Sequence, residues 1–313
     1  MKKFIITENL IPAVLLVLLA ACTKTPASNE DSVISVVTTT GMIADAVRNI
    51  AGSEVSVTAL IGPGVDPHLY KASQGDLEKL LAADLIFYNG LHLEGKMGEV
   101  LGGLGKRKPT TAVGEAVPDS LLRTPPGFSG AHDPHIWFDI RRWKYAVQKT
   151  SEILCTHYPE KAAAFRINTT HYLKRLDSLD QAARQALSVI PAEQRILVTA
   201  HDAFGYFGES YQVEVRGLQG ISTLSEFGLR DVTELVDFII SRQVRAIFVE
   251  TSVSTRSIEA VREGCSRKGW KVDIGNPLYS DSMGPAGKPE GTYIGMFAAN
   301  IKTITEALKP VNP

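Results

Sequence analysis

The chain has 313 residues, enough for a sizeable core and two lobes, and its 44% hydrophobic and 21% charged residues are ordinary for a globular protein. The formal net charge is -1, and the sequence has no stripe of Lys and Arg interleaved with aromatic residues. Such a stripe is typical of proteins that follow a nucleic-acid backbone, so we expect no nucleic-acid partner.

Residues 1–22 have the pattern of an export signal. Lys2 and Lys3 precede an apolar run that ends in small residues and Cys22. This run is shorter than expected for a membrane-spanning helix. Its ending, "LAAC", resembles a bacterial lipobox, in which the cysteine carries the lipid. The alternative is an ordinary signal peptide with a chance cysteine. Residues 23–32 are polar, as expected of a flexible tether.

From residue 33 the pattern alternates between strands and helices. Four β-rich runs are expected at 33–40, 55–62, 85–90 and 110–113, and helical segments at 42–52, 73–84 and 94–104. This alternation predicts an α/β lobe with a mainly parallel sheet over residues 33–158.

Residues 159–190 contain no glycine and no proline after Pro159. Apolar residues recur at three- and four-residue steps from Phe165 to Ile190, which predicts one helix of about thirty residues and roughly 45 Å. A helix of that length can connect two lobes stiffly.

The alternation then resumes over residues 191–313. Strands are expected at 195–201, 213–220, 246–250 and 271–275, and helices near 204–210, 231–243, 257–269 and 293–308. We therefore predict a second α/β lobe with the same element order but no readable sequence repeat. Cys155 and Cys265, in different halves, form no C-x-x-C pair and are expected to be buried free thiols.

Three histidines lie just beyond predicted strand ends or in stiff turns. His68 and His135 each end an Asp-Pro-His tripeptide, and His201 ends the strand "RILVTAH". Ligands of open α/β sheets bind at the carboxyl ends of strands, so these positions suit a shared site. Asp281, in "LYSDSMG", is a fourth candidate. From the residues alone, hydrogen-bonded turn residues remain the alternative.

Several acidic residues are candidates for supporting roles. Asp66, Asp133 and Asp202 each lie one or two residues from a histidine and could orient an imidazole. Glu226, in "STLSEFG", could act as a general base or as a solvated loop carboxylate. The cases for the other histidines are weaker, and only His132 is considered as a rim ligand.

Catalytic signatures are absent from the sequence: it has no G-x-S-x-G, H-E-x-x-H, P-loop or G-x-G-x-x-G after a strand. We therefore expect no enzyme and no organic cofactor. A metal-dependent hydrolase stays as an alternative, which would require an open coordination position and a general base.

Taken together, the segments "TTTGMIADAVRNIAG", "GPGVDPHLY", "NGLHLEGKMGEV", "DPHIWFD", "LVTAHDAFGYF", "GLQGIST" and "YSDSMG" closely resemble the metal-binding lipoproteins of zinc or manganese ABC transporters, in their TroA-like branch. The resemblance covers essentially the whole mature chain. It implies two α/β lobes joined by a long rigid helix, and a metal held in the cleft between them by His68, His135, His201 and Asp281.

The resemblance also implies a function. An extracytoplasmic protein, anchored by lipid to a bacterial membrane, would capture Zn²⁺ or Mn²⁺ as the transported ligand and deliver it to an ABC permease with a separate ATPase. We expect a monomer that binds zinc more tightly than manganese, because imidazole ligands favour zinc. Manganese-selective members tend to have glutamate at the position of His201. A surface adhesin is a further alternative.

Overall fold

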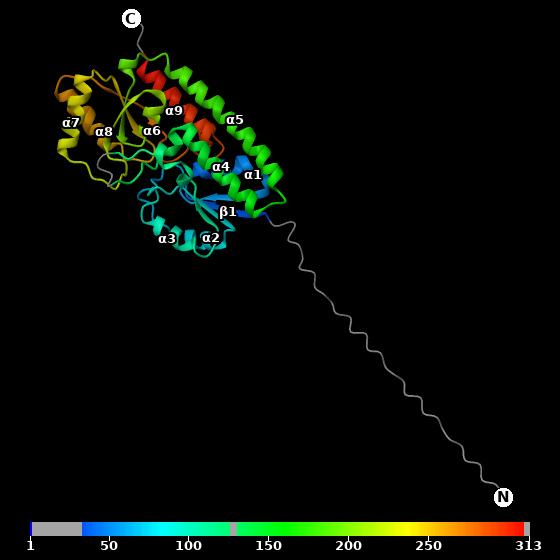
Figure 1. Ribbon diagram of the computed structural model, residues 1–313. Coiled ribbons are helices and arrows are strands. Elements are labelled where there is room, and N and C mark those ends of the chain that lie inside the picture. The colour runs from blue at the N-terminus through cyan, green and yellow to red at the C-terminus, as the bar shows by residue number, and fades with distance from the viewer. Residues whose placement is uncertain (2–32, 126–129, 310–313) are drawn as a thin grey trace. The chain divides into compact units, whose positions relative to one another are not determined.

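Figure 1 shows the computed structural model, in which residue 1 and residues 33–125 and 130–309 are described. The predicted lipid-bearing Cys22 and the tether 23–32 lie outside the described residues. Among the helices of the described part, none combines the length and the apolar character needed to cross a bilayer.

The N-terminal lobe is built on a four-stranded parallel sheet with the order β2-β1-β3-β4. Its strands are β1 (Ile34–Thr38), β2 (Val55–Ala59), β3 (Leu85–Tyr88) and β4 (Thr110–Ala112), and the helices between them are α1 (Gly41–Ala51), α2 (Gln74–Ala82) and α3 (Met97–Leu104). This is the alternation that the sequence predicts for the first lobe.

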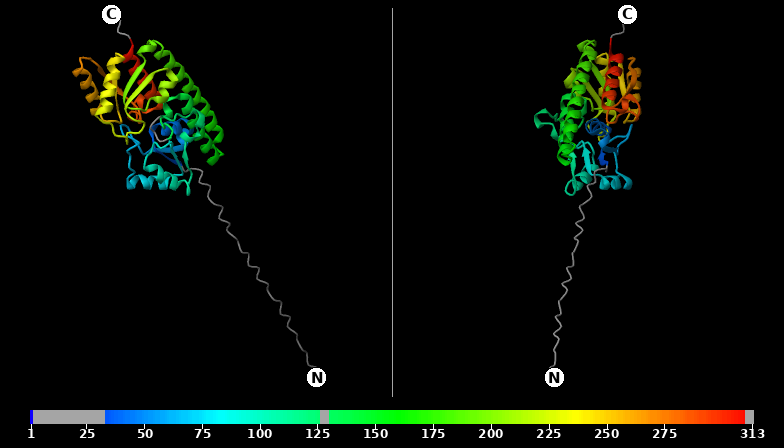
Figure 2. Two further views of the ribbon diagram at one scale, coloured as in Figure 1. Left: turned by 60° about the vertical axis from the view of Figure 1, so that its left-hand side comes forward. Right: turned by 90° about the vertical axis from the view of Figure 1, so that its right-hand side faces the viewer.

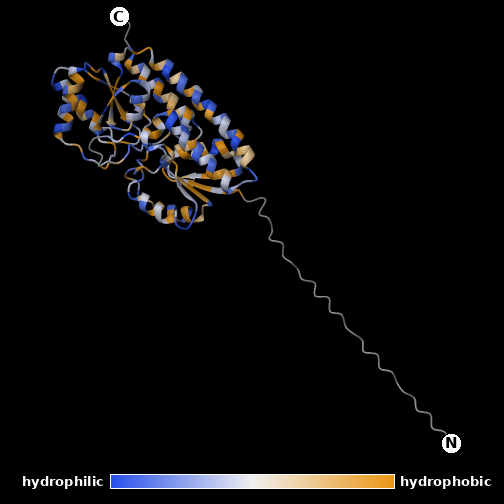
Figure 3. Ribbon diagram, in the orientation of Figure 1, coloured by the Kyte–Doolittle hydropathy of each residue, from blue (hydrophilic) through white to orange (hydrophobic). Residues whose placement is uncertain are grey.

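The C-terminal lobe contains two parallel strand pairs, β5-β6 and β7-β8, with β5 beside β7. Its strands are β5 (Ile196–His201), β6 (Glu214–Gln219), β7 (Ala246–Glu250) and β8 (Asp273–Leu278), and its helices are α6 (Gly205–Tyr211), α7 (Leu229–Ser241), α8 (Arg256–Arg267) and α9 (Tyr293–Leu308). Hydrophobic residues are concentrated in strands such as β1, β3, β5 and β7, whereas the helices around them carry hydrophobic and hydrophilic residues (Figure 3). The predicted α/β class with two parallel-sheet lobes is confirmed, whereas the exact lobe boundaries at 158 and 191 stay predictions.

One long helix, α4 (Ile140–His157), was not among the elements expected from the sequence. Asp139 caps it by accepting a hydrogen bond from the backbone N–H of Arg141 at 2.8 Å. Its buried face carries Trp143, Val147 and Leu154 at helical spacing. The helical period of these buried residues is therefore present in the sequence. It directly follows a turn that contains aromatic residues.

The long helix α5 spans Ala162–Leu187, 26 residues rather than about thirty. At 1.5 Å per residue it is about 39 Å long. Residues 159–161 form a turn instead of a first helical turn, which accounts for the difference at its N-terminus. The helix packs against α1 and α4 and also against α9, so it contacts elements of both lobes (Figure 2).

One apolar cluster runs through both lobes, and two further clusters lie within one lobe each. The shared cluster joins residues of α1, α4 and α5 to residues of α6 and α9. At its centre the rings of Trp143 and Tyr293 stack with centroids 5.3 Å apart, and those of Phe138 and Phe204 lie 4.2 Å apart. These contacts fix the lobes against each other, and the candidate site lies at the same junction. Within the described residues, Cys155 and Cys265 are free thiols as expected; Cys265 is buried, whereas Cys155 is only half-buried.

Candidate metal centre

The two Asp-Pro-His tripeptides have the same local structure. Asp66 accepts a hydrogen bond from the backbone N–H of His68 at 2.8 Å, and Asp133 accepts one from the backbone N–H of His135 at 3.0 Å. These are turns in which the aspartate bonds to the backbone two residues ahead, and the intervening proline restricts φ. The sequence thus presents each imidazole on a stiff turn.

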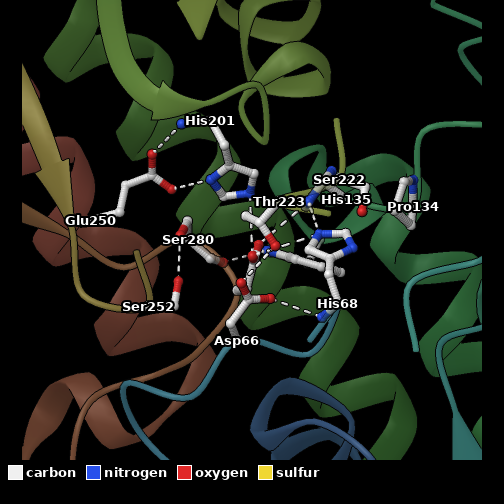
Figure 4. Close-up of polar contacts among 12 residues, drawn as sticks. Asp66, His68, Pro134, His135, His201, Ser222, Thr223, Glu250, Ser252 and Ser280 are labelled. Carbon is white, nitrogen blue, oxygen red and sulfur yellow. Dashed lines mark hydrogen bonds and ion pairs between the residues drawn. The ribbon is translucent and has the colours of Figure 1, made fainter. Parts of the chain in front are cut away.

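Two buried carboxylates lie against the imidazoles. Asp133 Oδ1 lies 2.8 Å from Nδ1 of His135. Glu250, at the end of β7, lies 2.6 Å from Nδ1 of His201 through Oε2, and its Oε1 accepts the backbone N–H of His201 at 2.9 Å (Figure 4). Carboxylates at Nδ1 leave the Nε2 atoms of both rings facing the centre, as in carboxylate–histidine–metal arrangements.

Asp281 lies at the centre of these imidazoles, beyond the end of β8. Its neighbours hold it in place: Ser280 O accepts a hydrogen bond from Trp137 Nε1 at 3.0 Å, and Ser282 Oγ accepts one from the backbone N–H of Gly64 at 2.9 Å. Both bonds link the C-terminal lobe to the N-terminal lobe. The segment that carries Asp281 is therefore fixed from the opposite lobe.

The spacing of the four side chains suits a metal ion. Nε2 of His68 lies 3.3 Å from Nε2 of His135, and Asp281 oxygens lie 3.2 Å from Nε2 of His201, 3.4 Å from that of His135 and 3.7 Å from that of His68. A tetrahedron with bonds of about 2.0–2.1 Å has edges of about 3.3 Å. All four residues are at most 4% exposed. The arrangement therefore fits a small cation enclosed by protein ligands.

The polar atoms at the centre lack other partners. Within the described residues, neither oxygen of Asp281 nor Nε2 of His201 has a hydrogen-bond partner, although all are buried. Leaving buried polar atoms unpaired is unfavourable unless something else binds them. Three imidazole nitrogens and one carboxylate are ligands that zinc and manganese accept.

The electrostatic environment favours positive charge on His135 and His201 but not on His68. Burial lowers the pKa of His68 to about 3. Burial acts in the same direction on His135, but its hydrogen bond to Asp133 and the nearby carboxylate of Asp281 raise its pKa to about 9. The pKa of His201 is raised well above its usual value, against burial, by the charges of Glu250 and Asp281. The carboxylates that stabilise an imidazolium here would also stabilise a divalent cation.

The other residues singled out in the sequence have different positions. Asp66 bridges the lobes, because its Oδ2 accepts a hydrogen bond from Thr223 Oγ1 at 2.6 Å. Asp202 is half-buried near Asp133 and Arg123, and burial raises its pKa. Glu226 is exposed, and the described residues provide it no hydrogen bond or ion pair.

His132 lies outside the group of four and contacts Asp119 at 2.8 Å. Sequence reasoning missed Glu250 and Thr223. The signal for Glu250 was a carboxylate ending the otherwise apolar strand "AIFVE".

Comparisons with known proteins point in one direction. The model of the family described as zinc-uptake complex component A, periplasmic (ZnuA), matches residues 36–307. The manganese-binding lipoprotein MntA of Bacillus subtilis is 52% identical over 287 residues, which are 92% of this chain and 94% of that protein. The zinc-binding protein TroA of Treponema pallidum is 50% identical over 273 residues, which are 87% of this chain and 88% of that protein.

Solved structures agree with these matches. The periplasmic zinc-binding protein TroA from Treponema pallidum superposes with a TM-score of 0.87 at 49% identity and covers 89% of this chain and 100% of that chain. Fe(III)-bound YtgA from Chlamydia trachomatis gives a TM-score of 0.77 at 30% identity over 88% of this chain and 98% of that chain. The resemblance read from the sequence motifs is thereby confirmed, and the chain belongs to the ZnuA family of periplasmic metal-uptake components.

Proposed function

We propose that this protein captures a divalent transition metal, zinc or manganese, outside the cytoplasmic membrane and delivers it to an ABC permease powered by a separate ATPase. The ligands are His68, His135, His201 and Asp281. The observation that carries the proposal is the buried group of three imidazoles and one carboxylate whose ligand atoms lie within 4.8 Å of one another, with no hydrogen-bond partner at either oxygen of Asp281 among the described residues. Relatives named for binding manganese and zinc support it.

The site suits carriage better than catalysis. Four protein ligands fill a tetrahedral zinc site, whereas catalytic zinc sites keep a position for water. A general base would also be needed, and the buried carboxylates beside the site, Asp133 and Glu250, already contact ligand imidazoles. Within the family, the role is that of a substrate-binding transport component.

Selectivity for zinc over manganese follows from the ligand set. Zinc binds imidazole nitrogen more strongly than manganese does, and three of the four ligands are imidazoles. Relatives of nearly equal identity carry manganese and zinc in their names, so the ligand chemistry supplies the argument. We propose binding of both ions, with zinc tighter.

The test is competitive binding to metal-stripped protein. We expect one Zn²⁺ per chain, displacement of Mn²⁺ by Zn²⁺, and an affinity that falls as pH drops below about 9, because the pKa of His135 is raised to about 9 and its imidazole must be deprotonated to bind. Isothermal titration over a pH series measures this. An absence of tight Zn²⁺ binding would refute the proposed function, and a pH-independent affinity would refute the three-imidazole ligand set.

We further propose that the protein acts as a monomer held to the membrane by a lipid on Cys22, with residues 23–32 as the tether. Incorporation of labelled fatty acid during expression tests the anchor. Wild-type protein should be labelled and recovered with membranes, whereas Cys22→Ala should be unlabelled. Equal labelling of both proteins would contradict the assignment.

A further inference from the structure

The loop between β3 and α3 has an unusual backbone. Four of its residues have positive φ: Gly90 (75°), Leu91 (53°), His92 (66°) and Gly95 (47°). For residues with a side chain, such as Leu91 and His92, this conformation is unfavourable. It persists only where the surrounding structure fixes it, so something must stabilise the loop from inside.

Glu94 is the residue that fixes it. Its carboxylate is buried, with the residue 2% exposed. It accepts hydrogen bonds from the backbone N–H of Asn89 at 2.6 Å and of Gly90 at 3.1 Å, and from Thr39 Oγ1 at 2.8 Å. Successive backbone N–H groups that converge on one anion form a nest. Thr39 directly follows β1, so the loop is also tied to the central strand of the sheet.

The two ends of this loop contact the two segments that carry the N-terminal-lobe histidines. At one end, Asn89 Nδ2 donates a hydrogen bond to the carbonyl of Pro134, the residue before His135, at 3.1 Å. At the other end, Gly95 packs so closely that a Cβ there would lie 2.7 Å from the carbonyl oxygen of His68. One seven-residue loop thus supports both His68 and His135, which are 67 positions apart in sequence. The rings of these two histidines lie side by side (Figure 4).

We propose that the Asn89–Gly95 loop, locked by Glu94, is a brace that sets the separation of His68 and His135 and thereby the metal affinity. Glu94 is a positioning residue, because none of its contacts is with a ligand side chain. Ligands must be held to within about 0.5 Å of their binding geometry. This inference rests on the proposed metal-binding function.

The test uses substitutions that leave all four ligands intact. Glu94→Gln places an amide N–H₂ among N–H and O–H donors, and Thr39→Val removes one donor while keeping the side-chain shape. Thr39→Ser keeps the hydroxyl and serves as the conservative variant. Glu99→Gln makes the same change of charge at an exposed position on α3 and is the matched control.

Two readouts separate positioning from general stability. Zn²⁺ affinity from competition should fall about 10- to 100-fold in Glu94→Gln, the range found when groups that orient metal ligands are lost, with a smaller loss in Thr39→Val. The visible absorption of bound Co²⁺, which reports ligand geometry, should change in the same two variants. Thr39→Ser and Glu99→Gln should match the wild type in both readouts.

The outcomes are distinguishable. If wild-type protein binds neither Zn²⁺ nor Co²⁺, the proposed function fails. If wild-type protein binds and folded Glu94→Gln and Thr39→Val retain its affinity and Co²⁺ spectrum, the brace is refuted while the function stands. Should Glu94→Gln not fold, as judged by thermal unfolding of the metal-free protein, Thr39→Val alone decides by the same criteria.

Discussion

Replacing Glu250 by glutamine tests how much the carboxylate behind His201 contributes to the site. Glu250 uses both oxygens on His201: Oε2 lies 2.6 Å from Nδ1, and Oε1 accepts the backbone N–H at 2.9 Å. Glutamine has only one acceptor oxygen, so one of these two groups would face an amide N–H₂. The imidazole would lose its orientation or its charge partner.

The expected size of this effect follows from the burial of the pair. Glu250 is 2% exposed and His201 is fully buried, so water cannot replace the lost contact. Loss of a group that orients a metal-binding histidine costs about 10- to 100-fold in affinity. This corresponds to about 1.4–2.7 kcal/mol of binding free energy.

The assay is competition for Zn²⁺ between the protein and a chromophoric chelator at pH 7. Glu259→Gln, an exposed position on α8, is the matched control and should bind as the wild type does. Circular dichroism and thermal unfolding of the metal-free proteins establish that each variant is folded. A folded Glu250→Gln that keeps wild-type Zn²⁺ affinity would refute the reasoning.

Three further predictions concern other parts of the molecule. His201→Glu should weaken Zn²⁺ more than Mn²⁺, measured by competition, because oxygen replaces imidazole; an unchanged preference would count against direct ligation. Thr223→Val removes the hydrogen bond to Asp66 and should speed metal release about tenfold in stopped-flow chelation, whereas Ser225→Ala should not; equal rates would contradict a role for this contact between the lobes. Asp76→Asn should cost about 1 kcal/mol of unfolding free energy at pH 7, measured in urea. Burial opposes ionisation of Asp76, but hydrogen bonds such as those from Ser73 outweigh it and lower its pKa. The contribution is therefore complete above the unfolded pKa of about 3.9 and is lost as pH falls below it. A difference from wild type that persists undiminished at low pH would be inconsistent with this assignment.

The sequence predicted the elements that show a clear period and the residues that lie next to them. The alternation from residue 33 identified both parallel-sheet lobes, and the stiff Asp-Pro-His turns singled out His68 and His135. Asp66 and Asp133 were expected to support these histidines, and both bond to the backbone N–H of their histidine. Such contacts are local in sequence, which is why they could be anticipated.

Contacts between distant segments were harder to predict. Glu250 meets His201 across 49 positions only because β5 and β7 are neighbours, and strand order cannot be read from periodicity. Thr223 meets Asp66 across 157 positions for the same kind of reason. The helix α4 has a helical period of buried residues, but polar and charged residues such as Arg141, Arg142 and Lys144 interrupt its apolar pattern near its start.

The core shared by the two lobes has a consequence for how the molecule unfolds. The stacked pair Trp143 and Tyr293 and the pair Phe138 and Phe204 each join residues from opposite halves of the chain. Neither half can bury these four aromatic side chains without the other, so the two lobes should melt in one cooperative calorimetric transition. By the same reasoning, a chimera that exchanges one lobe between relatives keeps its fold only if these aromatic partners are exchanged as matched pairs.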